Sequence, residues 1–215
     1  YQFVLIHLDQ VDYAGHYEGG PRDLRWDAAA NRSDNLLREI STTLDLNQDT
    51  LIVLSDHGQI DRGGHGGHEP ITLIEPFVMV GAGIKPGHYP DFLQIDVAPT
   101  IAALLGTNIP ASSQGQPLIE ILILAPDHKT LITDALITQK HRLLDAYQTA
   151  IGARAERQPA PDSTSGILER MEAAREKRLT AERLPRFALA LILALVPAYI
   201  LFLKRGRSLA WILGG

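Results

Sequence analysis

One stretch near the C-terminal end constrains the fold more than any other. Residues 187–203, FALALILALVPAYILFL, contain no charged side chain. At a rise of about 1.5 Å per residue, seventeen residues reach the lower limit for crossing about 30 Å of hydrocarbon, and Arg186 and Lys204 can extend to the interfaces. A buried core helix is the alternative, but Pro197 is better tolerated in a membrane. We therefore expect an integral membrane protein with a transmembrane helix at 187–203.

The residues around this helix suggest its orientation. A second apolar run, 208–215, is expected to begin a further span after the short basic stretch KRGRS at 204–208. Short loops follow the positive-inside bias, whereas long domains cross membranes largely regardless of charge. We therefore expect the basic loop in the cytoplasm and the long domain that precedes the helix on the extracytoplasmic side.

The rest of the chain divides by composition. Residues 1–125 carry 6 Lys and Arg against 16 Asp and Glu, and residues 126–215 carry 14 against 9. An acidic first part suits a cation site and is a poor nucleic-acid surface. The expected segments are a domain at 1–125, an amphipathic helix at 126–151, a linker at 152–166 and a charged juxtamembrane helix at 167–186. Because the chain opens at Tyr1 on an apolar run, we expect a piece of a longer protein.

The first domain alternates strand-like and helix-like segments. Residues 2–8, 50–56 and 76–84 are nearly continuous apolar runs, as in strands buried on both faces of a parallel sheet. Helical patterns lie at 23–44 and at 95–106, where Asp96 is a candidate N-cap and Gly106 a stop signal. This alternation predicts an α/β fold with a mainly parallel sheet flanked by helices.

Ionisable residues gather where the first two predicted strands end. Asp12 and His16 follow the first strand, and Asp56 and His57 follow the second. His65 lies between two glycines in LSDHGQIDRGGHGGHEP (54–70), where the backbone can turn back over the site. Carboxylates and imidazoles without cysteine favour zinc, manganese or iron over calcium. We expect a site for one of these divalent metals.

Each of these residues also has a simpler interpretation. An isolated Asp-His pair at a strand end is commonly structural, and an isolated D-x-x-x-H pattern carries little information. His68 could replace His65 as a ligand, although the spacing from Asp56 favours His65. His7, inside the first apolar run, is expected to be a core histidine.

Four motifs in this order resemble a known enzyme group. DQVDYAGH, SDHG, GGHGG and DVAPTIAALLGTNIP are similar to the C-terminal half of the catalytic domain of the alkaline phosphatase superfamily. The nearest branches are the type I phosphodiesterases/nucleotide pyrophosphatases and, more closely, the membrane-bound ethanolamine-phosphate transferases of glycolipid-anchor synthesis. The similarity covers about residues 1–120.

The resemblance implies an α/β/α sandwich and a phosphodiesterase or phosphoethanolamine-type transferase acting through a covalent phospho-enzyme. It also implies two divalent metal ions, with zinc the first choice and manganese the alternative. Asp12, His16 and His65 would hold one ion, and Asp56 and His57 would help hold the other. The nucleophile of such enzymes lies upstream of these motifs, so no residue is assigned that role and the 215 residues alone are expected to be inactive. The implied substrate is a phosphate ester, with a lipid or glycolipid as one form.

Other functions remain open at this point. A sulfatase would use calcium, which several histidines argue against, and a phosphatase of the same superfamily is the other enzyme alternative. A non-catalytic membrane protein that only binds metal is the alternative from another functional class.

Overall fold

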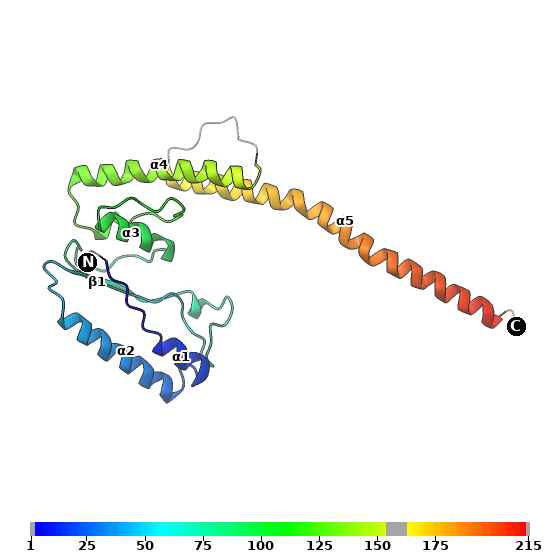
Figure 1. The fold of residues 1–215 in the computed structure, drawn as a ribbon, viewed down its shortest axis with the longest axis horizontal. Coiled ribbons are helices and arrows are strands. Elements are labelled where there is room, and N and C mark those ends of the chain that lie inside the picture. Colours follow the sequence, from blue (N-terminus) through cyan, green and yellow to red (C-terminus); the bar gives the residue numbers. More distant parts are fainter. Residues whose placement is uncertain (1–2, 154–162, 214–215) are drawn as a thin grey trace. The chain divides into compact units, whose positions relative to one another are not determined.

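The computed structural model describes residues 3–153 and 163–213. The chain divides into two compact units, Tyr1–Thr133 and Asp134–Gly215. Figure 1 shows the elements in chain order: α1 (Gln10–Tyr17), α2 (Leu24–Thr42), β1 (Thr50–Leu54), the 3-10 helix η1 (Pro70–Thr72), β2 (Phe77–Gly81), η2 (Gln94–Asp96), α3 (Val97–Leu104), η3 (Ile119–Ile121), α4 (Pro126–Ala150) and α5 (Thr164–Leu213).

The predicted fold class is wrong. The described residues are mostly helical and contain one two-stranded sheet, in which β1 and β2 pair antiparallel with Ile52 opposite Met79. A parallel pair needs a crossover connection, usually a helix, but the chain between these strands forms only loop and the single turn η1. Without a crossover helix, the second strand returns alongside the first in the opposite direction.

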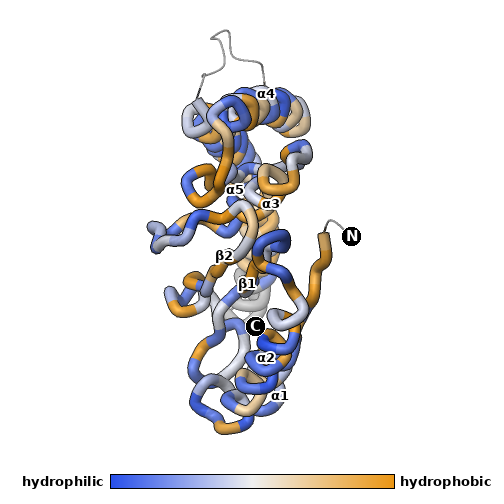
Figure 2. The backbone as a smooth tube through the Cα atoms, turned by 90° about the vertical axis from the view of Figure 1, so that its left-hand side faces the viewer, coloured by the Kyte–Doolittle hydropathy of each residue, from blue (hydrophilic) through white to orange (hydrophobic). Residues whose placement is uncertain are grey.

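The first predicted strand does not form. Residues 3–8 have no strand assignment, and Leu5 is 80% exposed. Figure 2 shows this apolar segment leading from the N-terminus toward α1. His7 is exposed as well, so its expected place in a core is wrong. An apolar run shows that a segment can be buried, but it does not specify the partner that would bury it.

The helices of the first unit follow the sequence signals more closely. The pattern at 23–44 forms α2, whose N-cap Asp23 accepts a hydrogen bond from the Arg25 backbone N–H. The pattern at 95–106 forms α3, with Asp96 at its N-cap position and Gly106 at a positive φ of 65°. The core between α3 and the sheet is small and apolar: Ile84, Ala103, Ile121 and Leu122 are buried, with Phe77 and Met79 of β2 against them.

The second unit is helical. Leu144 of α4 packs with Ile167 and Met171 of α5 in a buried cluster. α5 is one continuous helix that includes the charged segment 167–186, the apolar segment 187–203 and residues 204–208, for which a loop was expected. Of the expected linker, residues 154–162 lie outside the described part of the chain, as do residues 214–215 of the expected second span.

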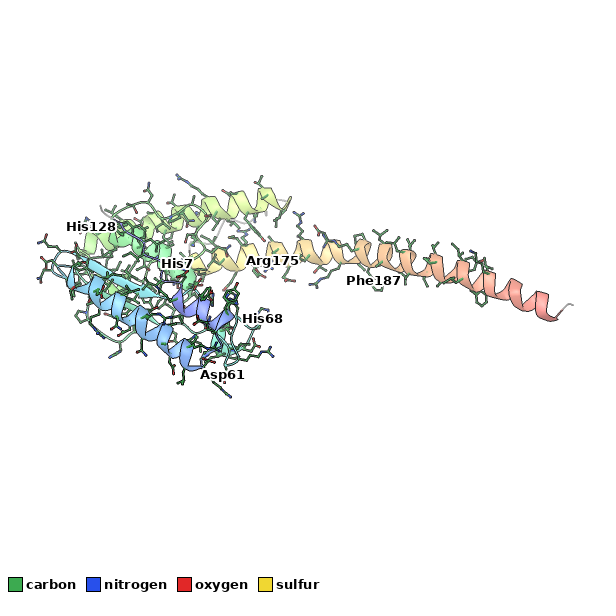
Figure 3. All side chains as sticks on the ribbon, turned by 60° about the horizontal axis from the view of Figure 1, so that its bottom comes forward. His7, Asp61, His68, His128, Arg175 and Phe187 are labelled. Carbon is green, nitrogen blue, oxygen red and sulfur yellow. The ribbon has the colours of Figure 1, made fainter. Side chains whose placement is uncertain are left out.

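The apolar part of α5 is suited to a membrane. By length and composition, Thr164–Lys204 is the one described helix that could cross a bilayer. Phe187, labelled in Figure 3, and Phe202 are 69% and 73% exposed. A core helix would bury such side chains, so their exposure favours lipid over a protein interior as their surroundings.

Candidate metal centre

The first two candidate ligands lie on α1. Asp12 and His16 are one helical turn apart, so their side chains lie on the same face, with His16 Nε2 3.7 Å from Asp12 Oδ1. α1 packs against α2 and buries Ala14 and Gly15. The site is therefore built on a helix, and not at the end of a buried parallel strand as the sequence suggested.

The other candidate ligands come from the loop between β1 and β2. This loop lies against α1 through its glycines: the Gly64 N–H donates to the Gly15 carbonyl oxygen over 3.0 Å. Gly63 has a φ of +92°, and a Cβ atom there would lie 2.3 Å from the Gly15 oxygen. Only glycine combines this backbone conformation with this close approach. The glycine-rich sequence thus brings His65 back to α1.

Four of the five predicted ligands meet at one point. His65 Nε2 lies 3.2 Å from Asp12 Oδ1 and 2.8 Å from His16 Nε2. His57 Nε2 lies 3.7 Å from the same Asp12 oxygen, and the rings of His57 and His65 are 4.0 Å apart between centroids. Asp12 Oδ1 is therefore the atom around which all three imidazoles gather.

The orientation of His57 leaves one ring nitrogen available. Its Nδ1 lies 3.0 Å from the Gly58 carbonyl oxygen. A carbonyl oxygen only accepts hydrogen bonds, so Nδ1 carries the proton in this contact. In the neutral ring, the Nε2 lone pair then faces Asp12 and can bind a cation.

Asp56 and His68 lie at the edge of this arrangement. Asp56 Oδ1 is 3.8 Å from His57 Nε2, and its side chain is 81% exposed. Its backbone is held from η2, because the Gln94 side-chain amide donates to the Asp56 carbonyl oxygen over 2.9 Å. Asp12, His57 and His65 form the compact ligand group of the described residues, and His16 joins it through the 2.8 Å contact of its Nε2 with His65 Nε2. His68, labelled in Figure 3, is exposed and has no hydrogen bond, ion pair or ring contact with any of these four residues in the described part of the chain.

The donor set fits a divalent transition metal. The candidate ligand atoms of Asp12, His57 and His65 all lie within 4.8 Å of one another. Zinc bonds of about 2.0–2.2 Å at tetrahedral angles place ligand atoms roughly 3.3 Å apart, close to the 3.2 and 3.7 Å separations from Asp12 Oδ1. Imidazole nitrogen and carboxylate oxygen also suit zinc or manganese.

The surroundings of Asp12 favour its charged form. Partial burial raises the pKa of the Asp12 carboxyl, but the hydrogen bond with His65, the charge of His16 and the hydrogen bond from Gln59 outweigh this. The pKa of Asp12 therefore lies below its ordinary value. A carboxylate that is charged at neutral pH is the form that binds a cation.

Gln59 and Trp26 lie beside the candidate ligands, but no motif in the sequence indicates that they belong to a site. Gln59 donates from Nε2 to Asp12 Oδ1 over 3.2 Å and accepts at Oε1 from Trp26 Nε1 over 2.7 Å. A single glutamine in a polar loop, and a tryptophan in the first turn of a helix, are common in positions without function. Only the structure places them beside Asp12.

Part of the chain matches a family of known proteins. Residues 1–77 match the model of the family described as "Type I phosphodiesterase / nucleotide pyrophosphatase". The range includes all five predicted metal ligands. No solved structure matches the chain.

Curated relatives match over a longer part of the chain. GPI ethanolamine phosphate transferase 2 of Candida albicans is 31% identical over 162 residues, which are 69% of this chain and 18% of that protein. GPI ethanolamine phosphate transferase 2, catalytic subunit, of Homo sapiens is 27% identical over 57% of this chain and 13% of its own length. The Saccharomyces cerevisiae transferase 2 is 28% identical over 67% of this chain and 20% of its own.

The chain thus spans a fifth or less of these three relatives. The resemblance stated from the motifs is confirmed: residues 1–77 are similar to the type I phosphodiesterase/nucleotide pyrophosphatase family, and the chain is distantly similar, over part of its length, to GPI ethanolamine phosphate transferases.

Proposed function

We propose that this chain supplies a divalent metal centre to a membrane-anchored enzyme that acts on phosphate esters, as a phosphodiesterase or a phosphoethanolamine-type transferase. The observation that carries the proposal is the meeting of Asp12 with His16, His57 and His65. These residues come from α1 and from a separate loop, and they lie within the part of the chain that matches a phosphodiesterase family.

In this proposal Asp12, His16, His57 and His65 hold one zinc or manganese ion that keeps a further coordination position for a phosphate oxygen, as catalytic metal sites do, and exposed Asp56 takes part in holding a second. When bound, a divalent cation supplies positive charge that polarises a phosphoryl oxygen and offsets developing negative charge. The chain's own residues fix the position of that charge. The resemblance also implies a covalent phospho-enzyme, and no residue of this chain is assigned as its nucleophile.

The proposed substrate and location follow from the relatives and from α5. The named relatives are GPI ethanolamine phosphate transferases, which supports a phosphate ester carried on a lipid or glycolipid. The exposed apolar segment of α5 supports attachment to a membrane. We propose that the metal centre faces the extracytoplasmic side, since a long folded domain can cross irrespective of charge.

Phosphorus NMR of the full chain in detergent micelles tests the function. Mn²⁺ bound at the site relaxes a phosphorus nucleus held within a few ångströms. Phosphoethanolamine added to the Mn²⁺-loaded chain is expected to show a ³¹P line broader than with the same free Mn²⁺. The Asp12→Ala variant should lose this extra broadening.

The same experiment distinguishes an enzyme acting on phosphate esters from a protein that only binds metal. A metal centre without catalytic purpose needs no open position for phosphate. If Mn²⁺ binds to the chain with no extra broadening of the phosphorus line, the non-catalytic metal-binding protein becomes the better account.

A further inference from the structure

Gln59 joins the candidate metal centre to α2. Its side-chain amide lies between two partners on different helices: Asp12 of α1 and Trp26 in the first turn of α2. All three side chains are partly buried. The contact is therefore a link across three segments that are distant in the sequence.

The chemistry of the partners fixes which way the amide points. An indole N–H only donates, so Trp26 Nε1 must meet the Gln59 carbonyl oxygen. The other end of the amide, which only donates, is then directed at Asp12. Without Trp26, either end of the amide could face the carboxylate, and a carbonyl oxygen there would repel it.

The neighbouring backbone leaves the amide little room to move. A Cβ atom at Gly15 would lie 2.1 Å from Gln59 Nε2, so the amide rests directly against the α1 backbone. The start of α2 is fixed in turn, because the Asp23 carboxylate accepts from the Arg25 backbone N–H and pairs with its side chain. Trp26, one residue further on, thus has a well-defined position.

We propose that Gln59, oriented by Trp26, is a positioning residue that holds the Asp12 carboxylate in its metal-binding orientation. This inference rests on the proposed metal centre. Asp12 Oδ1 has two lone pairs. The Gln59 amide takes one of them at 3.2 Å, and the other faces His65 Nε2 at 3.2 Å, where a cation held by both side chains would lie. Partners of this kind outside the ligand set typically change metal affinity about 10–100-fold when removed.

Zinc affinity of the full chain in micelles, measured by competition with a chromogenic chelator, tests the link. Gln59→Met keeps the size of the side chain but removes its hydrogen bonds to Trp26, to the Asp12 carboxylate and to the Asp12 backbone carbonyl oxygen, and should weaken Zn²⁺ binding about 10-fold. Trp26→Phe should weaken it about 3-fold, because it frees the amide to rotate. The double variant should bind no more weakly than Gln59→Met, since Trp26 acts only through Gln59.

A matched control is available in the same chain. Gln48 is exposed and donates from its amide to Asp45 Oδ2 over 3.1 Å, outside the candidate site. Gln48→Met should leave zinc affinity unchanged. Circular dichroism shows whether each variant is folded, and if Gln59→Met is not, Trp26→Phe alone decides the question.

The outcomes separate this inference from the proposed function. If the unaltered chain does not bind Zn²⁺, the proposed metal centre fails. If it binds Zn²⁺ and a folded Gln59→Met or Trp26→Phe variant binds equally well, or if the two losses simply multiply in the double variant, the positioning role is overturned and the metal centre stands.

Discussion

The two segments that form the proposed metal centre hold their side chains in different ways. α1 places Asp12 and His16 through helical periodicity, so any residues one turn apart would share that face. The loop between β1 and β2 places His57 and His65 through backbone contacts, such as the Gly64 N–H to the Gly15 oxygen at 3.0 Å. Metal binding by α1 therefore depends on the side chains that the helix carries. The position of the loop depends instead on glycines, which have no side chain to block the approach to α1.

This difference predicts opposite sensitivities. On α1, replacing a ligand should remove metal binding and leave the helix intact, since alanine is the best helix former. In the loop, adding one methyl group at a crowded glycine should disturb both the fold and the site. The predictions below test this contrast from the largest effect to the smallest.

His16→Ala is expected to give the largest loss on the helix side. Removal of a ligand should weaken Zn²⁺ binding by more than about 100-fold, beyond the range seen for residues that only support a ligand. The melting temperature of the metal-free chain should change little. Chelator competition and thermal unfolding measure the two effects; unchanged zinc affinity would remove His16 from the ligand set.

Gly63→Ala should cause a combined loss in the loop. The left-handed conformation at a φ of +92° costs an alanine about 1–2 kcal/mol, and the contact with the Gly15 oxygen at 2.3 Å adds to it. We expect a lower melting temperature and zinc affinity reduced about 10-fold or more. In Gly63→Ala the melting temperature and the zinc affinity should both fall, whereas in His16→Ala only the zinc affinity should fall.

Gly64→Ala is the matched control for this prediction. Gly64 has a φ of +80°, and a Cβ atom there would have no neighbouring atom within 4 Å. Its substitution should cost only the conformational strain of about 1–2 kcal/mol, with zinc affinity retained. Equal losses of affinity in both variants would show that the close approach to α1 is not what positions His65.

His68→Ala should have an effect close to zero. His68 is exposed and, unlike His16, has no contact with Asp12 or His65 in the described residues, so zinc affinity should stay within about 2-fold of the unaltered chain. His65→Ala, three residues earlier in the loop, serves as the positive control. If His68→Ala instead matched the loss in His65→Ala, the choice of His65 over His68 from spacing would be wrong.

The smallest effect concerns acid stability without metal. The pKa of Asp12 is lowered in the fold, so its contribution to stability is present above the unfolded-state pKa of about 3.9 and is lost as the pH falls through the folded-state pKa. Its side chain is 45% exposed, so the effect is small, about 0.2–1 kcal/mol. Asp12→Asn should lower the melting temperature by a few degrees or less at pH 7, and the difference should shrink toward pH 2. A difference in melting temperature that stays constant between pH 7 and pH 2 would contradict this prediction.

The sequence predicts the helices better than the sheet. The apolar pattern of α3 and the uncharged run within α5 each specify a local structure, because the information lies within the segment itself. The sheet needs a partner for each strand. The apolar runs at 50–56 and 76–84 contain β1 and β2, but the direction of these strands depends on the connecting loop, and residues 3–8 have no partner strand in the described chain.

The site is partly predictable for a related reason. Aspartate and histidine have distinctive chemistry, so their spacing among glycines indicates ligands from the sequence alone. Gln59 has no such distinctive chemistry; its importance depends on Trp26 and Asp12, 33 and 47 positions away. Supporting residues of this kind become visible only when the fold brings their partners together.

Nitrogen NMR of the histidine rings is the most direct test of whether His16, His57 and His65 bind the same metal ion. The chain has eight histidines, and a long-range ¹H–¹⁵N spectrum of the full chain in micelles, with and without one equivalent of Zn²⁺, reports which ring nitrogens bind. We expect the Nε2 signals of His16, His57 and His65 to shift together, while those of His68 and His88 stay in place. A spectrum in which these three rings do not respond to Zn²⁺, or in which His68 responds in place of His65, would contradict it.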